Sequence, residues 1–247
     1  MDDDRFRIAY EKSINTFYDK KTIGILGEKK LHSFLKHYFE PDDTFHECKI
    51  NGFIADISKD EQIYEIQTSS FNVLRNKLDC FLKEHKVTLI YPIPYIKWLY
   101  WIDEENGEIT KKRKSPKVGS FAEAFYELYK IKMFLKNENL SICLILIDME
   151  EYRLLNGWST DKKKGSTRYE RIPLKIVEKI TLSCAKDYRM LIPTDIETPF
   201  TTKQLAKCLG VNLRRAQLML NILNHMQVVY RCGRCKNAYL YEITNYS

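Results

Sequence analysis

A hairpin of two short strands, an amphipathic helix and a third strand follow one another in the first half of the chain. Phe53–Ile57 and Ile63–Ile66 are apolar runs of strand type, and Lys59-Asp60 lies between them as a turn. Residues 71–84 repeat apolar side chains at helical spacing, and 87–93 is a continuous apolar strand. This order is typical of a βαβ crossover in a mixed sheet. The chain is therefore predicted to be an α/β protein.

Acidic side chains interrupt this predicted hairpin. Asp56 lies inside the first apolar run, and Glu65 and Gln67 share one face of the second strand, opposite Ile66, because side chains alternate along a strand. The turn can bring Asp56 near that same face. Two carboxylates and an amide would then surround one point, and magnesium prefers oxygen ligands of this kind.

This pattern resembles the PD-(D/E)xK nuclease superfamily, whose core motif is an Asp, a spacer and Glu-x-Lys on the next strand. The Lys position reads Gln67 here, as in some restriction endonucleases that carry Glu-x-Gln and remain active. Glu28 resembles the first-helix Glu that many members place beside the metal. An equally good interpretation is that its carboxylate complements the helix dipole. Lys77, on the following helix, is the candidate for the missing lysine, since some members have moved the basic group there.

The resemblance implies a restriction-endonuclease-like mixed β-sheet core flanked by helices, and a metal-dependent DNA endonuclease. Gln67 would orient the attacking water, and Lys77 or a loop lysine would stabilise the charge that develops on phosphorus. The expected cofactor is Mg²⁺ or Mn²⁺. The resemblance assigns catalysis to Asp56, Glu65, Gln67 and Lys77, and metal binding to Glu28, Asp56, Glu65 and the carbonyl of Ile66.

Two helices are predicted before the hairpin. Aromatic residues at helical spacing indicate a short helix within residues 1–21, and an apolar stripe that stops before a proline indicates a second over about 24–39. His32 and His37 lie on the second helix but are five residues apart, so they do not face the same way as a metal pair would. Both are predicted to be surface histidines.

The remaining elements follow from apolar runs and turn residues. The Asn51-Gly52 dipeptide predicts a hairpin turn after a first strand at His46–Cys48. Pro92 and Pro94 are expected to end the strand at 87–93. Further elements are predicted as a strand at 97–102, a core helix at 121–135 and a buried strand at 141–149.

The densest positive patch lies between these later elements. A flexible basic loop beside an acidic metal site suits contact with a phosphodiester backbone, although a solvated loop has the same composition. The candidate DNA-binding residues there are Lys111, Lys112, Arg113, Lys114 and Lys117. A second basic cluster, Lys162–Lys164 with Arg168 and Arg171, belongs to a polar stretch that is either a loop reaching toward the ligand or a linker.

The C-terminal third resembles a winged helix-turn-helix, and the predicted domains are a nuclease-like domain at 1–171 and this small α+β domain at 172–247. Thr201 or Thr202 caps its first helix, Gly210 ends it and Asn212 caps the second. The second helix would enter the major groove and the wing would touch phosphates, unless the domain mediates protein contacts instead. The residues concerned are Arg214, Arg215 and Gln217 on the helix, and Arg231, Arg234 and Lys236 on the wing.

Cysteine usage does not indicate a zinc centre or a disulfide framework. Cys232-Gly-Arg-Cys235 supplies two ligands, whereas a structural zinc site needs four, and Cys208 and His225 are the nearby complements. The pair is therefore predicted to form a wing turn. The seven cysteines are odd in number and mostly lie in apolar runs, as expected in a reducing compartment.

Composition narrows the class of protein and its partners. The net charge of +7 suits a polyanion such as DNA without demanding one. The charged N-terminus lacks a secretory signal, and no apolar run approaches the roughly 18 residues that span a bilayer, so a cytoplasmic protein without membrane contact is expected. Cutting both strands would favour a homodimer or a partner nuclease. The alternatives are a nuclease-fold DNA-binding or assembly protein without turnover, and a generic α/β protein with a regulatory winged helix.

Overall fold

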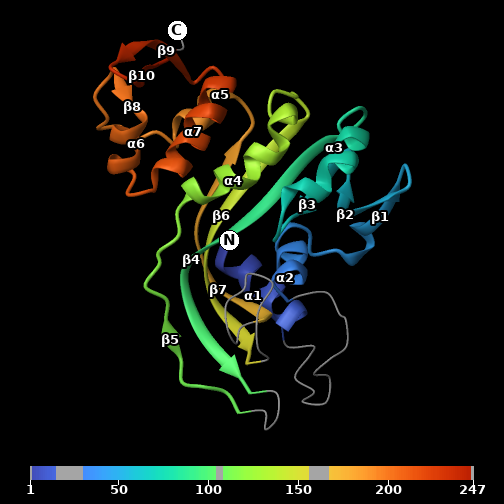
Figure 1. Cartoon of the computed structure of the whole chain (residues 1–247). Helices are drawn as coiled ribbons and strands as arrows, with labels where there is room; N and C mark the ends of the chain where they lie inside the picture. Colours follow the sequence, from blue (N-terminus) through green and yellow to red (C-terminus); the bar gives the residue numbers. More distant parts are fainter. Residues whose placement is uncertain (1, 15–29, 104–107, 156–166, 246–247) are drawn as a thin grey trace. The chain divides into compact units, whose positions relative to one another are not determined.

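The computed structural model describes residues 2–14, 30–103, 108–155 and 167–245 (Figure 1). Within these ranges a seven-stranded sheet has the order β1-β2-β3-β4-β6-β7, with β5 beside β4. The strands β1 and β2 are antiparallel, whereas β3 and β4 are parallel. The predicted α/β class, a large mixed sheet flanked by helices, is therefore confirmed. The strands are β1 (His46–Ile50), β2 (Phe53–Lys59), β3 (Gln62–Ile66), β4 (Lys86–Ile102), β5 (Arg113–Lys114), β6 (Leu140–Leu154) and β7 (Thr167–Leu182).

The chain divides into two compact units that are interleaved in sequence. The first unit comprises Met1–Lys59, Pro92–Gly119 and Ile145–Lys179, and the second comprises Asp60–Tyr91, Ser120–Leu144 and Ile180–Ser247. The predicted domain boundary between residues 171 and 172 falls within β7. None of the described helices is both long and apolar enough to cross a membrane.

The first unit contains a helix pair and a hairpin. α1 (Asp2–Ile14) packs on α2 (Lys30–Phe39) through Phe6 and Phe34, whose ring centroids are 4.8 Å apart. The predicted hairpin turn is confirmed: Asn51 and Gly52 both have positive φ, 47° and 83°, as a two-residue type I′ loop requires. A short 3₁₀ turn, η2 (Asp43–Phe45), connects the helix pair to β1.

In the second unit, β3 is followed by a helical segment that buries one apolar face. η3 (Phe71–Leu74) continues into α3 (Arg75–Phe81), and the predicted apolar face, including Phe71, Leu78 and Phe81, is buried. The predicted helix over 71–84 therefore begins as a 3₁₀ turn and ends three residues early. Ser70 caps this turn by accepting a hydrogen bond from the Asn72 N–H.

The C-terminal part of the second unit is built from short helices and a small sheet, coloured orange to red in Figure 1. Thr201 caps α6 and Asn212 caps α7, and both side chains accept hydrogen bonds from backbone N–H groups as predicted. The strands have the order β8-β10-β9. The elements are α5 (Ala185–Arg189), β8 (Phe200–Thr201), α6 (Thr202–Cys208), α7 (Leu213–His225), β9 (Val229–Cys235) and β10 (Ala238–Ile243).

Pro92 and Pro94 do not end their strand, because β4 continues to Ile102. Proline lacks an N–H group, so it is tolerated only where no ladder hydrogen bond is needed. Backbone hydrogen-bonding groups alternate between the two edges of a strand, and both prolines are an even number of residues from Ile90. The Ile90 carbonyl accepts a hydrogen bond from the Gln67 N–H at 2.9 Å. β3 has ended at that point, so no β3 residue requires a donor from either proline.

Three further predictions are corrected by the structure. The turn between β2 and β3 is Asp60-Glu61, with φ of 49° and 64°, one residue later than predicted, because β2 extends through Lys59. The strand predicted at 97–102 is the second part of β4. The helix predicted over 121–135 is divided into η4 (Phe121–Ala124), α4 (Phe125–Leu128) and η5 (Tyr129–Phe134).

A buried carboxylate organises the first unit beside β4. The Glu151 side chain is 1% exposed, and its oxygens lie 3.1 Å from Lys97 Nζ and 2.5 Å from Arg153 Nη2. Burial raises the pKa of Glu151, but the charges of Lys97 and Arg153 outweigh it and hold the pKa below the ordinary 4.5. A carboxylate with a lowered pKa stabilises the fold above its unfolded pKa, and this contribution is lost as pH falls through the folded pKa.

We therefore expect Glu151→Gln to lower the free energy of unfolding at pH 7 by about 2 kcal/mol. This is less than the roughly 3–5 kcal/mol lost when a fully buried pair is broken, because Lys97 and Arg153 remain partly exposed. Urea unfolding from pH 7 to pH 3 should show the difference from the parent protein shrinking below about pH 4.5. A difference that does not change with pH would contradict the assigned charge of Glu151.

Candidate active site

Glu65 is a buried carboxylate in the second unit. It lies on β3 opposite Leu89 of β4, and its side chain is 2% exposed. Lys77 on α3 reaches it: Lys77 Nζ lies 2.5 Å from Glu65 Oε2 and is 18% exposed. A buried carboxylate requires a charge or hydrogen-bond partner, and the apolar face of α3 holds Lys77 in place to supply one. The structure thus brings together two of the residues predicted from sequence.

Gln67 is held by the segment that follows β3. Its side-chain Nε2 donates hydrogen bonds to Ser69 Oγ at 3.0 Å and to the Ser70 carbonyl at 2.8 Å. Lys130 Nζ in turn donates to Ser70 Oγ at 2.9 Å. The amide nitrogen of Gln67 is therefore engaged with its own loop, which leaves the carbonyl oxygen of that amide as the atom suited to accept a hydrogen bond from water.

Asp56 lies on β2 in the first unit and contacts a histidine. Its Oδ2 is 3.3 Å from Nε2 of His32, which α2 contributes. Sequence reasoning treated His32 as a surface residue. A signal was available, since His32 follows Glu28 by four residues, which is one helical turn. Glu28 itself lies outside the described residues.

The donor set fits a hard divalent cation. In the second unit, Glu65 and the Ile66 carbonyl offer oxygen atoms, which are the ligands that magnesium and manganese accept. Ile66 is a buried β3 residue next to Glu65. Asp56 belongs to the first unit and the other two residues to the second.

The predicted basic loop is exposed, but part of it is ordered as a strand. Lys114 of β5 pairs with Trp98 of β4, and Lys112 Nζ lies 4.8 Å from the centre of the Trp98 ring. Lys112 also contacts Glu150 at 2.9 Å. Burial raises the pKa of Glu150, but hydrogen bonds from Lys112, Tyr152 and Tyr100 outweigh it and lower that pKa. All five predicted residues are exposed, namely Lys111, Lys112, Arg113, Lys114 and Lys117.

The second basic cluster is only partly described. Lys162–Lys164 lie outside the described residues. Arg168 Nε is 3.7 Å from a Glu151 oxygen, and Arg171 is buried at 6% exposure. These two arginines therefore belong to the buried charge network and interior of the first unit.

The helix α7 separates its three predicted DNA-binding residues. Arg214 and Gln217 are exposed. Arg215 packs on Tyr126 of α4, 5.3 Å from its ring centre, and its Nε is buried without a hydrogen-bond partner. Further along the same helix, Lys132 Nζ donates to Asn221 Oδ1 at 2.8 Å. These contacts fix α7 against α4 and η5.

On the ribbon of β9 and β10, two arginine side chains stack on one tyrosine ring. The guanidinium carbons of Arg231 and Arg234 lie 4.1 Å and 4.5 Å from the centre of the Tyr239 ring. Such stacking holds the guanidinium groups at the surface while their charge stays available to an anion. The turn predicted at Cys232–Cys235 instead falls after Cys235, where Lys236 has φ of 54°. Both cysteines are exposed and unbridged.

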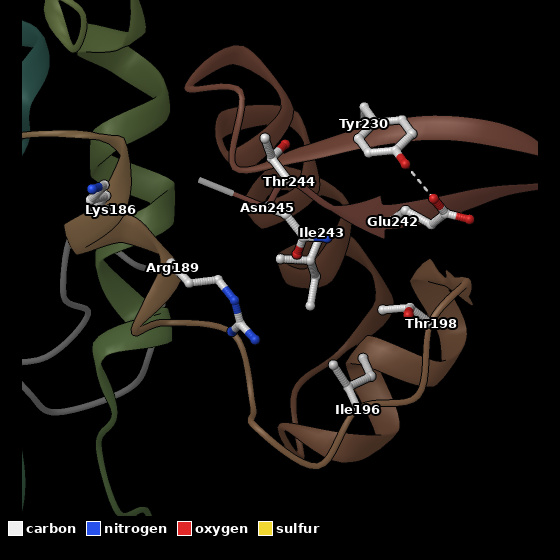
Figure 2. A pocket seen from close by; sticks show the side chains of 9 residues that line it. All are labelled: Lys186, Arg189, Ile196, Thr198, Tyr230, Glu242, Ile243, Thr244 and Asn245. Carbon is white, nitrogen blue, oxygen red and sulfur yellow. Dashed lines mark hydrogen bonds between the residues drawn. The ribbon is translucent and has the colours of Figure 1, made fainter. Parts of the chain in front are cut away.

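A polar hollow of about 680 Å³ lies beside this ribbon and was not predicted from sequence (Figure 2). Lys186 and Arg189 of α5 line it together with Tyr230 and Glu242, whose side chains are hydrogen-bonded to each other. The hydrogen bond to Glu242 raises the pKa of Tyr230. None of the residues predicted to act in catalysis or DNA binding lines this hollow.

A second group missed by the sequence analysis lies in the first unit. His37, Asp43 and His46 direct one potential ligand atom each toward a common point. The predicted strand that begins at His46 is confirmed as β1. His37 and Asp43 come from α2 and η2, and the five-residue spacing from His32 concealed this arrangement, because the partners of His37 lie after the helix.

Comparison with known proteins identifies a family for the segment that runs from α2 to β7. A family model described as "Domain of unknown function (DUF8091)" matches residues 29–183, which run from just before α2 to just past β7. An uncharacterized protein of Treponema pallidum (strain Nichols) is 33% identical over 151 residues, covering 61% of this chain and 57% of that relative. The chain thus spans less than two thirds of that relative's length. No solved structure gives a significant match. Because the family model covers more than half of the chain, the protein belongs to the DUF8091 family.

Proposed function

We propose that this protein is a metal-dependent DNA endonuclease with a restriction-endonuclease-like core. The observation that carries the proposal is the ion pair between Lys77 and Glu65, at 2.5 Å. In the Glu-x-Gln variant of the nuclease motif, the basic group has to come from elsewhere, and Lys77 on α3 is close enough to Glu65 to provide it. The pairing of an oxygen-rich site with one lysine is what hydrolysis of a phosphodiester requires.

In this proposal each residue of the site has its own role in catalysis. Glu65 and the Ile66 carbonyl would hold Mg²⁺ or Mn²⁺, and Asp56 is the further carboxylate that the motif assigns to the metal. A bound ion would polarise the phosphate and lower the pKa of a water. Gln67 accepts a hydrogen bond from the attacking water through its carbonyl oxygen. Lys77 turns from Glu65 toward the phosphate oxygens and stabilises their added negative charge. His32 orients Asp56 through their 3.3 Å contact.

The C-terminal helices and ribbon would deliver the enzyme to DNA as a winged helix-turn-helix. Arg214 and Gln217 are the exposed candidates for base contacts on α7, while Arg215 stabilises the packing on Tyr126. Arg231 and Arg234 suit phosphate contacts on the wing. The basic residues around β5 suit additional contacts to the backbone.

One observation favours a second candidate, a nuclease-fold DNA-binding or assembly protein without turnover. Glu65 is only 2% exposed, and its Oε2 is already paired with Lys77. A carboxylate neutralised by a partly buried lysine can have a structural role alone, because the fold then needs no metal to balance the charge. The two candidates differ in whether the protein cuts DNA.

We expect Asp56→Asn and Glu65→Gln each to reduce metal-dependent DNA cutting by at least about 100-fold, because each removes an anionic metal ligand. The assay is cleavage of supercoiled plasmid and of labelled duplex and single strands in magnesium, manganese or EDTA. Glu178→Gln, an exposed carboxylate of the first unit, serves as the control and should cut normally. DNA binding without cutting by the parent protein would favour the second candidate.

We expect Lys77→Met to abolish most of the cutting while Lys77→Arg retains a measurable part, because only the arginine keeps a cation near Glu65. Lys83→Met removes an exposed lysine close to the same helix and should have no effect. Far-ultraviolet circular dichroism of each variant checks that the fold is kept. Equal activity of Lys77→Met and the parent protein would remove Lys77 from the mechanism.

We expect the double variant Arg231→Ala/Arg234→Ala to weaken duplex binding and to reduce the slope of log K against log salt by about 2, because each phosphate contact contributes about 0.9 to that slope. Lys49→Ala/Lys83→Ala removes two exposed charges elsewhere and is the matched control. Fluorescence anisotropy over a salt series gives both slopes. An equal change in both variants would mean that the ribbon contributes only net charge.

A further inference from the structure

His37, Asp43 and His46 form a compact cluster in the first unit. His37 Nε2 lies 3.1 Å and His46 Nδ1 lies 3.8 Å from the same oxygen, Asp43 Oδ1. All three ligand atoms lie within 4.8 Å of one another. The histidine side chains are 14% and 8% exposed, whereas Asp43 is 67% exposed. The cluster is therefore shielded on the histidine side and open to solvent on the carboxylate side.

In each imidazole ring, one nitrogen is hydrogen-bonded to a backbone carbonyl and the other faces Asp43. The first hydrogen bond determines which nitrogen of the neutral ring carries the lone pair. His37 Nδ1 is 2.8 Å from the Ser33 carbonyl, and His46 Nε2 is 2.9 Å from the Glu40 carbonyl. A carbonyl only accepts hydrogen bonds, so both of these nitrogens carry the proton. In the neutral rings, the lone pairs of His37 Nε2 and His46 Nδ1 then point toward a carboxylate oxygen. Three acceptors in such proximity are satisfied either by a second proton on an imidazole ring or by a bound metal ion.

Metal-binding histidines in proteins have the same arrangement. A histidine ligand commonly donates its other N–H group to a backbone carbonyl, which fixes the tautomer and the ring orientation. Zinc takes His nitrogens and Asp oxygens at about 2.0–2.2 Å in a tetrahedron, which places neighbouring ligand atoms about 3.3 Å apart. The observed separations of 3.1 Å and 3.8 Å bracket that spacing.

The backbone around the cluster is fixed by its own hydrogen bonds. The Asp42 side chain accepts from Thr44 N at 3.0 Å and from Thr44 Oγ1 at 2.8 Å. The Glu40 side chain accepts from Asp42 N at 3.0 Å and pairs with Lys59 at 2.8 Å. The segment that carries Asp43 is thus held in place without a metal, as a preorganised site requires.

We propose that His37, Asp43 and His46 bind one divalent transition-metal ion of the zinc type, with water completing the coordination. The site is separate in chemistry from the proposed magnesium site, because it offers two nitrogens and one oxygen rather than oxygens alone. It joins the last turn of α2 to η2 and to the first residue of β1. Its role is to tie these three elements together.

Lys12 provides an internal test of this assignment. Its Nζ lies 3.6 Å from Asp43 Oδ1 and 2.6 Å from the Pro41 carbonyl, so a second cation already approaches the exposed carboxylate. A metal ion at the cluster would be repelled by that ammonium group. Removal of its charge in Lys12→Met therefore increases zinc affinity, whereas removal of a ligand decreases it.

The experiment is zinc titration of the full chain after treatment with EDTA, by isothermal titration calorimetry, with cobalt absorption as a measure of coordination geometry. We expect one zinc ion per chain. His37→Gln, His46→Gln and Asp43→Asn should each weaken binding by more than about 10-fold, the lower end of the loss seen when only an outer partner is removed. Lys12→Met should bind more tightly than the parent protein.

Three control variants separate this site from others. Glu178→Gln and His85→Gln alter an exposed carboxylate of the first unit and a histidine of the second, and both should bind zinc normally, as should the Asp56→Asn/Glu65→Gln variant of the proposed nuclease site. Asp43→Asn changes an exposed residue, so it tests the site even if a histidine variant fails to fold. An absence of zinc binding by the parent protein, or equal binding by Asp43→Asn and the parent, would overturn the proposal.

Discussion

Burial of Glu65 is the constraint on which the second unit depends. A carboxylate on a central parallel strand loses its hydration, and the fold tolerates this only if a cation or hydrogen-bond donors replace the water. Lys77 supplies the cation at 2.5 Å, which requires α3 to lie with one face on the apolar core and its lysine toward β3. The register of the helix, the position of β3 and the chemistry of the candidate site are therefore set by one pair.

The same principle operates in the first unit with other residues. Glu151 is buried between Lys97 and Arg153, and Asp56 is accompanied by His32. In each case an acidic side chain on a strand is matched by a basic side chain from a neighbouring element. Buried charges of this kind contribute less to stability than apolar packing of the same volume, so their retention in several places is consistent with a functional requirement for charge.

Two kinds of metal chemistry are proposed, and the ligands distinguish them. The residues around Glu65 and Asp56 offer carboxylate and carbonyl oxygens, which suit magnesium and phosphate chemistry. The cluster of His37, Asp43 and His46 offers imidazole nitrogens whose protons are fixed by backbone carbonyls, which suits zinc. The second set of ligands lies where three elements of the backbone meet.

The sequence by itself determined features that depend on local chemistry. The Asn51-Gly52 turn, the caps Thr201 and Asn212, and the apolar face of α3 follow from backbone preferences and periodicity, and all are observed. The resemblance to the nuclease motif indicates Lys77, whereas its contact with Glu65 depends on the tertiary structure.

Tertiary structure decided the features that depend on neighbours distant in sequence. β4 passes through Pro92 and Pro94 because β3 has already ended, and Arg215 is withdrawn from the surface because Tyr126 lies beside it. His37 meets Asp43 and His46 only because the chain turns back after α2. Periodicity reports the face of a single element, whereas these outcomes depend on which other element covers that face.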